Sequence, residues 1–166
     1  MTDEHVDDPT ERSRWRPVRL LLSALDDEIA TIYAEAAIDG LRPTWVMELI
    51  RLHRRGPMTI AELARSVQVT HSGESQKVAA MRAAGLVRTV PGPDARSKRV
   101  TLTAKATRLV DRLAAEWEAT EAAIADLEDE LPYPLTRVVT DIQEALARRS
   151  FHDRIRDRLD RDPRWV

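Results

Sequence analysis

The chain has 166 residues, of which 43% are hydrophobic and 4% aromatic, so aliphatic side chains and alanine must fill the core of one domain, with or without extensions. It has no cysteine, which excludes disulfides, thiolate–metal sites and thiol redox sensing. The net charge of −2 is not typical of nucleic-acid-binding proteins, and the acidic N-terminus and short apolar runs predict a cytoplasmic protein with neither a signal peptide nor a membrane partner.

The N-terminal part is predicted to be an arm followed by a helix. Residues 1–16 are polar and charged, with Trp15 as the exception, and we expect a flexible arm there. Residues 17–40 are predicted to be an N-terminal dimerisation helix, because apolar residues recur at helical spacing from Val18 to Ile38. Gly40 is its expected end.

Residues 41–103 are predicted to form a winged helix-turn-helix. A helix over 44–54 comes first, and the basic run at its end, residues 53–55, either stabilises the negative helix C-terminus or contacts a phosphate. Thr59 and Glu62 have the spacing of a capping box, so a second helix should start there. Thr70 can cap a third helix, over 70–84, and Gly85 suits its end.

A basic hairpin should follow. Strand formers lie at 86–90 and 100–102, and a turn cluster, Pro91-Gly92-Pro93-Asp94, separates them. The stretch from Arg42 to Lys105 has 12 Lys and Arg residues against four Asp and Glu residues, a balance of +8, while the remainder has 14 against 24, a balance of −10. Because the local field rather than the total charge steers a protein to DNA, this segment is a candidate for DNA binding.

Residues 104–166 are predicted to be a C-terminal helical dimerisation region. One long helix should run from Thr103 to about Leu127, and a second from Leu135 to about Leu159, with a break at residues 128–134. The mixed charges from Arg148 to Arg161 indicate an exposed helix with ion pairs. The apolar stripes of the terminal helices need cover, which a second copy of the chain supplies most simply.

Three stretches resemble the MarR family of bacterial winged helix-turn-helix transcription regulators. They are AELARSVQVT, the run to AAGLVRTV, and PDARSKRVTLT with its Asp94-x-Arg96 wing pattern, and the layout over roughly 18–150 follows the family order. The resemblance implies a mainly α fold with a β-hairpin wing and long terminal dimerisation helices. It also implies a homodimer that binds a pseudo-palindromic operator on double-stranded DNA, usually as a repressor, and that many members release DNA in response to a small-molecule effector or an oxidant.

The DNA-binding side chains are expected on the helix over 70–84, in the major groove, and on the wing over 86–102. Serine and glutamine at the start of such a helix meet base edges, and arginine and lysine of a wing meet phosphates or a narrow minor groove. The alternatives are a capping role for Thr70, a local pair with Asp94 for Arg96, and surface positions without a role for the others. The predicted residues are Thr70, His71, Ser72, Ser75, Gln76, Lys77, Arg88, Arg96, Lys98 and Arg99.

Two residues depart from the family pattern in the predicted recognition helix. Gly73 lowers helix propensity by roughly 1 kcal/mol relative to alanine. Glu74 stands where relatives commonly have an apolar residue, so it either faces phosphate, is buried at a cost, or is favoured as an acid in the first helical turn. These departures, with Lys77, leave an alternative function: a winged-helix dimerisation or protein-interaction module with reduced DNA affinity.

Other kinds of site have weaker support. Tyr33, Trp45 and Trp117 either line an effector pocket, as in many relatives, or pack in the core. His5, His53, His71 and His152 show no metal-ligand spacing, so neither a metal nor another cofactor is expected. The absence of a phosphate-binding glycine loop and of a nucleophile elbow predicts that the protein is not an enzyme.

Overall fold

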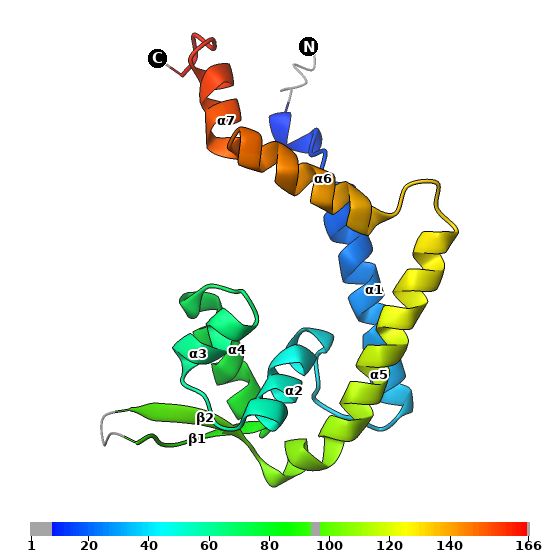
Figure 1. Ribbon diagram of the computed structural model, residues 1–166, viewed down its shortest axis with the longest axis vertical. Coiled ribbons are helices and arrows are strands. Elements are labelled where there is room, and N and C mark those ends of the chain that lie inside the picture. Colours follow the sequence, from blue (N-terminus) through cyan, green and yellow to red (C-terminus); the bar gives the residue numbers. More distant parts are fainter. Residues whose placement is uncertain (1–7, 94–96, 166) are drawn as a thin grey trace, which may run out of the picture. The chain divides into compact units, whose positions relative to one another are not determined.

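The computed structural model describes residues 8–93 and 97–165, and it is mainly helical with one two-stranded hairpin, as predicted (Figure 1). The chain divides into two compact units, residues 1–115 and 116–166. The elements in chain order are η1 (Pro9–Glu11), α1 (Arg16–Glu35), η2 (Pro43–Trp45), α2 (Val46–Arg55), α3 (Ile60–Ser66), α4 (His71–Ala83), β1 (Val87–Pro91), β2 (Lys98–Leu102), α5 (Ala104–Asp129), α6 (Leu135–Arg148) and α7 (Phe151–Leu159).

The core of the first unit is formed where α2, α3, α4 and the hairpin meet. Leu49, Leu63, Met81 and Leu86 have no exposed surface. Burial of a leucine or methionine side chain contributes about 1.5–3 kcal/mol, so these few side chains hold the three short helices together. The first turns of α5 complete this core through Ala106, Val110 and Leu113.

α1 ends earlier than the sequence predicted. The helix was expected to continue to Ile38 and to stop at Gly40, but it ends at Glu35. Ala37 takes a positive φ of 52°, and the Ile38 N–H donates to the Tyr33 carbonyl at 2.8 Å. This turn buries Tyr33 and Ile38, so core packing rather than a glycine ends the helix.

The helix-turn-helix has the predicted caps. Thr59 Oγ1 accepts from the Glu62 N–H at 3.2 Å, and the Thr59 N–H donates to Glu62 Oε2 at 2.7 Å. That second bond is the main cause of the lowered pKa of Glu62. Gln68 between α3 and α4 has a φ of 59°, a left-handed conformation that reverses the chain within a few residues.

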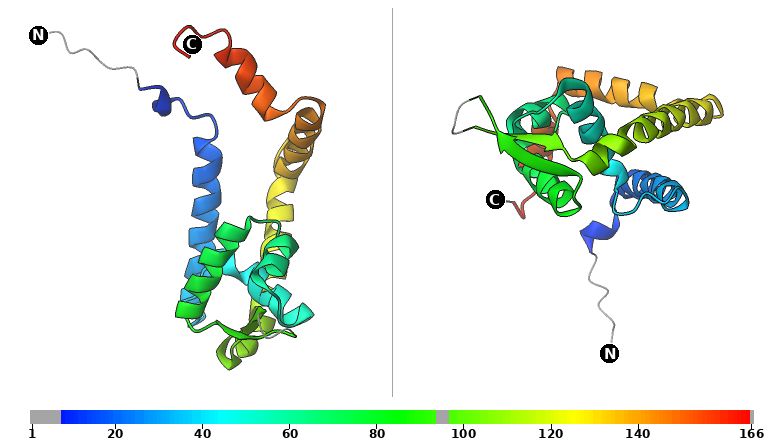
Figure 2. Two further views of the ribbon diagram at one scale, coloured as in Figure 1. Left: turned by 90° about the vertical axis from the view of Figure 1, so that its left-hand side faces the viewer. Right: turned by 90° about the horizontal axis from the view of Figure 1, so that it is seen from below.

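The wing is an antiparallel hairpin in which Val87 pairs with Leu102 and Pro91 with Lys98. β2 is also bridged to Met58 by two backbone hydrogen bonds, of 3.0 and 2.6 Å, so the segment before α3 anchors the wing. The hairpin projects from helices α2 to α4, as Figure 1 and the right-hand view of Figure 2 show.

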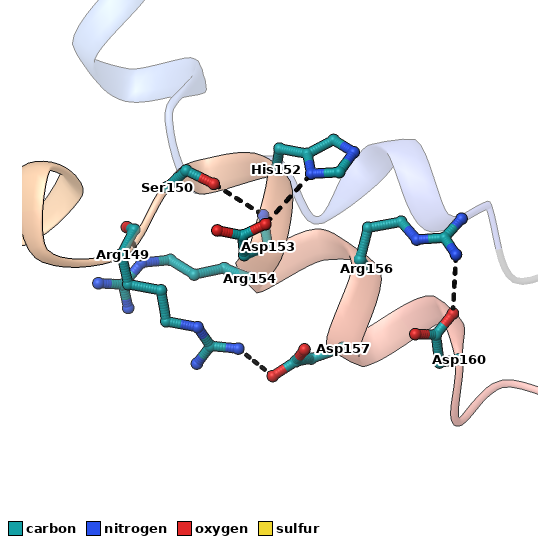
Figure 3. A network of polar contacts seen from close by, with 8 residues as sticks. All are labelled: Arg149, Ser150, His152, Asp153, Arg154, Arg156, Asp157 and Asp160. Carbon is teal, nitrogen blue, oxygen red and sulfur yellow. Dashed lines mark hydrogen bonds and ion pairs between the residues drawn. The ribbon is translucent and has the colours of Figure 1, made fainter.

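The second unit contains a helix boundary that the sequence analysis missed. The predicted helix over 135–159 is interrupted, because Arg149 is extended and the Ser150 hydroxyl accepts from the Asp153 N–H at 3.0 Å, which starts α7. The predicted ion pairs are present: Arg149 contacts Asp157, and Arg156 lies 3.5 Å from Asp160 (Figure 3). All four of these charged side chains are about half exposed, so their contribution to stability is small.

Candidate nucleic-acid interface

α4 presents a polar outer surface near its N-terminus. Thr70 caps the helix by accepting from the Gly73 N–H at 3.2 Å, and the Gly85 φ of 71° allows the chain to leave its other end. Ser72 and Gln76 are exposed and lie one helical turn apart, and Ser75 between them is half-buried. This surface offers hydrogen-bonding groups of the kind that can bind base edges, without a negative charge among them.

The wing adds cationic groups. Arg88 and Lys98 are exposed and Arg99 is half-buried. Because Arg88 pairs with Thr101 and Val90 with Arg99, the two arginines lie on the same face of the hairpin, opposite the buried Val100. That arrangement places both side chains on the face opposite Val100, where the exposed Arg88 can bind phosphate oxygens.

A surface hollow lies between the end of α2, α3 and β2. Arg55, Arg65 and Arg99 line it, together with the capping carboxylate of Glu62. Arg99 Nε is buried and has no hydrogen-bond acceptor in the described part of the chain. Three guanidinium groups and one carboxylate leave this hollow positively charged, which favours an anionic group such as a phosphate.

Behind the polar surface of α4 lies a buried cluster of charge. Glu74 on α4 has no exposed surface and Glu48 on α2 is 1% exposed. Lys77 Nζ lies 2.5 Å from Glu48 Oε1. Burial is the main cause that raises the pKa of Glu74 to about 6; the charge of Glu48 raises it further, and that of Lys77 lowers it.

The comparisons with known proteins agree with this geometry. Residues 44–106 match the family model described as a winged helix DNA-binding domain. No curated protein sequence matches the chain. The Mycobacterium tuberculosis transcriptional regulator MosR, solved in complex with DNA, is 25% identical with a TM-score of 0.59, over 82% of this chain and 98% of that one.

Two further solved structures share the fold. A MarR protein from Peptoclostridium difficile has a TM-score of 0.54 at 19% identity, over 89% of this chain and 91% of that one. The Staphylococcus aureus MepR–DNA complex has a TM-score of 0.59 at 15% identity, over 81% of this chain and 96% of that one. The chain contains a winged helix DNA-binding domain and has the fold of these solved MarR-type structures. The resemblance that the sequence predicted is thereby confirmed, in the winged-helix domain by the family model and in the fold by the solved structures.

Most predicted DNA-binding residues lie on α4, on its cap or on the wing. Thr70, His71, Ser72 and Gln76 are exposed. Lys77 differs from them, because its ammonium group is directed to Glu48 and not outward. Arg96 lies outside the described residues.

The aromatic residues proposed for an effector pocket lie in different surroundings. Tyr33 and Trp45 are buried, at 3% and 6% exposure, within the core of the first unit. Trp117 is half-buried and belongs to the second unit. The burial of the first two agrees with the core-packing alternative, and the effector pocket stays a prediction.

Sequence patterns did not reveal Glu48 or Arg65 as members of a site. Glu48 stands in an otherwise apolar stripe of α2, between Trp45 and Leu49, and a charge at such a position was the available signal. Its partner Lys77 is 29 residues away, so no local pattern could have paired them. In the described part of the chain no group of three or more His, Asp or Glu residues could hold a metal ion, and no helix is long and apolar enough to cross a bilayer.

Proposed function

We propose that the protein is a dimeric, cytoplasmic transcription regulator, acting as a repressor, that binds a pseudo-palindromic operator. α4 enters the major groove, and the basic wing lies beside it against phosphates or in the minor groove. The observation that carries the proposal is the surface of α4, where Ser72 and Gln76 are exposed while the one acidic side chain of the helix, Glu74, is turned into the core. DNA in the solved MosR and MepR complexes gives the proposal its nucleic-acid partner.

Each DNA contact has a separate role in this proposal. Gln76 bonds bidentately to an adenine edge, while Ser72 and Ser75 donate to or accept from either kind of base pair. Arg88, Lys98 and Arg99 neutralise phosphates, and Arg96 reaches into the groove from the wing. Lys77 positions α4 through Glu48 and does not contact DNA.

The dimer follows from apolar surface that one copy leaves exposed. On α1, Leu21, Leu22 and Ile32 are 50–52% exposed. In the second unit Leu127, Val139 and Phe151 are 45–64% exposed. A second copy covers this surface, and a small-molecule effector changes the spacing of the two α4 helices, which in a DNA-competent dimer lie about 34–36 Å apart.

Binding to DNA from upstream of the protein's own gene tests the function. We expect saturable binding that resists competitor DNA and weakens steeply with salt, because each neutralised phosphate releases counterions. Arg96→Ala should weaken binding by about 1–3 kcal/mol, whereas Arg156→Ala, on exposed α7, should not change it. An Arg96→Ala affinity equal to that of the wild type removes this residue from the interface.

The second candidate function is a winged-helix dimerisation or protein-interaction module with reduced DNA affinity. Gly73 in α4 favours it, because glycine loosens a recognition helix. Glu74 no longer supports it by repulsion of phosphate, because its carboxylate is buried. Weak binding without preference over competitor DNA, at low salt and with fragments from several operators, is the result that this alternative predicts.

A further inference from the structure

We propose that Glu48 and Glu74 form a proton-binding site inside the helix-turn-helix, and that its occupancy controls how tightly α4 binds DNA. The first half of the proposal stands on the buried cluster alone. The second half rests on the proposed function.

The cluster has more carboxylate oxygens that can accept hydrogen bonds than it has donors to supply them. Lys77 Nζ donates to Glu48 Oε1 at 2.5 Å. The other three carboxylate oxygens, Glu48 Oε2 and both oxygens of Glu74, are buried and have no donor in the described part of the chain. A buried carboxylate without a donor is costly, and a proton converts it into a neutral group that can itself donate.

The charge balance points to uptake of one proton. Two buried carboxylates and the partly exposed ammonium group of Lys77 leave a net charge of −1 in this cluster, and a single proton neutralises it. The raised pKa of Glu74, about 6, agrees with this. The negative charge of Glu48 lies close enough to raise the pKa of Glu74 further, so Glu48 belongs to the same site.

The neighbouring elements do not alter this balance. α4 packs against α3 and β1. The charged residues there are Glu62 and Arg65 on α3 and Arg88 on β1, and none of them contributes to the pKa shift of Glu74. Of the described residues, Glu48 on α2 and Lys77 on α4 are therefore the charged partners that matter.

Proton binding and DNA binding should favour each other. Glu74 lies in the first turn of α4, directly behind the side chains proposed to meet the bases, so DNA phosphates add negative potential at its carboxyl group. That potential makes the neutral form still more favourable when DNA is bound. By linkage, the neutral form then binds DNA more tightly than the charged form does.

The first experiment needs no DNA. The side-chain carboxyl carbons of the full-length protein are titrated by NMR, with Glu74→Gln and Glu48→Gln used to assign the two signals. We expect a titration with a midpoint near pH 6 that disappears in Glu74→Gln. If the Glu74 carboxyl group titrates near 4.5, as an exposed glutamate does, the proton site does not exist.

The second experiment measures operator affinity from pH 5.5 to 7.5 in wild type and in Glu74→Gln, which keeps the shape of the protonated side chain. The wild type should bind the operator at least about fivefold more tightly at pH 5.5 than at pH 7.5. A factor of this size is typical of allosteric coupling. Glu74→Gln should lose that pH dependence and keep only what other groups contribute. Equal pH dependence in the two proteins overturns the coupling.

The two experiments separate the proposals. If NMR finds the titration but no DNA binds at any pH, the regulator function fails and the proton site stands. If DNA binds but Glu74 titrates normally, the regulator function stands and the proton site fails.

Discussion

At the scale of single residues, Glu74 is held in surroundings that oppose its charge. Its pKa is raised from 4.5 to about 6, so the folded protein favours the protonated form. The stability that this preference contributes is fully present below pH 4.5 and is lost as the pH rises through 6. One pKa unit corresponds to about 1.4 kcal/mol, so the loss is about 2 kcal/mol.

Glu74→Leu should therefore stabilise the protein in a pH-dependent way. The substitution removes the buried carboxylate, and its gain in the free energy of unfolding should be about 2 kcal/mol larger at pH 7.5 than at pH 4.5. Urea unfolding at both pH values measures it. Glu48→Gln is the contrasting variant, because it takes the charged partner from Lys77 and should not stabilise at pH 7.5. A Glu74→Leu gain independent of pH would show that the carboxyl group is ionised normally in the folded state.

The sequence predicts the role of a residue when that role depends on near neighbours in the chain, and not when it depends on how helices pack. The caps at Thr59 and Thr70 bind backbone groups three residues away, so the spacing alone reveals them. Whether Glu74 faces DNA or the core depends on how α4 packs against α2 and α3. That packing is a tertiary property, and the sequence left both orientations open.

At the scale of elements, the N-terminus of α4 combines a stabilising cap, Thr70, with a residue of low helix propensity, Gly73. The Thr70 hydroxyl accepts from the Gly73 N–H, and a Cβ added at Gly73 would lie 3.2 Å from that same hydroxyl oxygen. An alanine at this position therefore gains helix propensity but presses on the cap.

A double-mutant cycle should resolve this balance. Thr70→Ala alone should lower the free energy of unfolding by about 1 kcal/mol. Thr70→Ser keeps a capping hydroxyl and should lose much less. Gly73→Ala should stabilise by up to about 1 kcal/mol in the Thr70→Ala background, where the hydroxyl is absent, and by less in the wild type. Thermal or urea unfolding of the four proteins gives the coupling. Equal effects of Gly73→Ala in both backgrounds would mean that the Thr70 hydroxyl moves aside for the added methyl group without loss of stability.

The same scale shows where sequence patterns fail for helix ends. Periodicity placed every long helix but continued the last one through residues 149 and 150, because apolar residues keep recurring on both sides of the break. The Ser150-x-x-Asp153 pattern of a helix start is present in the sequence, but it lies within the mixed charges from Arg148 to Arg161 and was interpreted as part of one exposed helix. At the end of α1, the glycine at 40 was the expected stop, but alanine at 37 adopts the positive φ because burial of Ile38 compensates for the strain.

At the scale of the whole molecule, the proposed function requires two copies. Three consecutive leucines of α1, at positions 20–22, are at least half exposed in a single chain of 18.8 kDa. Stable monomers rarely expose so large an apolar patch. We therefore expect light scattering to give twice the mass of one chain. A charged residue within the covered surface should dissociate the dimer, because burial of an unpaired carboxylate costs several kcal/mol.

Leu22→Asp tests this, with Ser23→Asp as its matched control. Leu22 is 52% exposed and lies on the stripe of α1 that continues to the buried Tyr33. Ser23 is also exposed, and its position on the helix turns it away from Leu21 and Ile32. Both variants add the same charge to the same helix, so a difference between them reports the surface that the partner covers. Leu22→Asp should raise the dimer dissociation constant at least about tenfold, which is 1.4 kcal/mol, and Ser23→Asp should leave it near the wild-type value.

The dimer variant also decides whether the two α4 helices act together on DNA. A monomer engages one half-site with one α4 and one wing, so Leu22→Asp should lose operator affinity while keeping the weak, salt-dependent binding of a single winged helix. At protein concentrations high enough to restore the dimer, full affinity should return, because no DNA-contacting residue has changed. An operator affinity that falls with Leu22→Asp and does not recover at high concentration would place the defect in the fold of α1. An unchanged affinity in a demonstrated monomer would mean that one copy is sufficient to read the site.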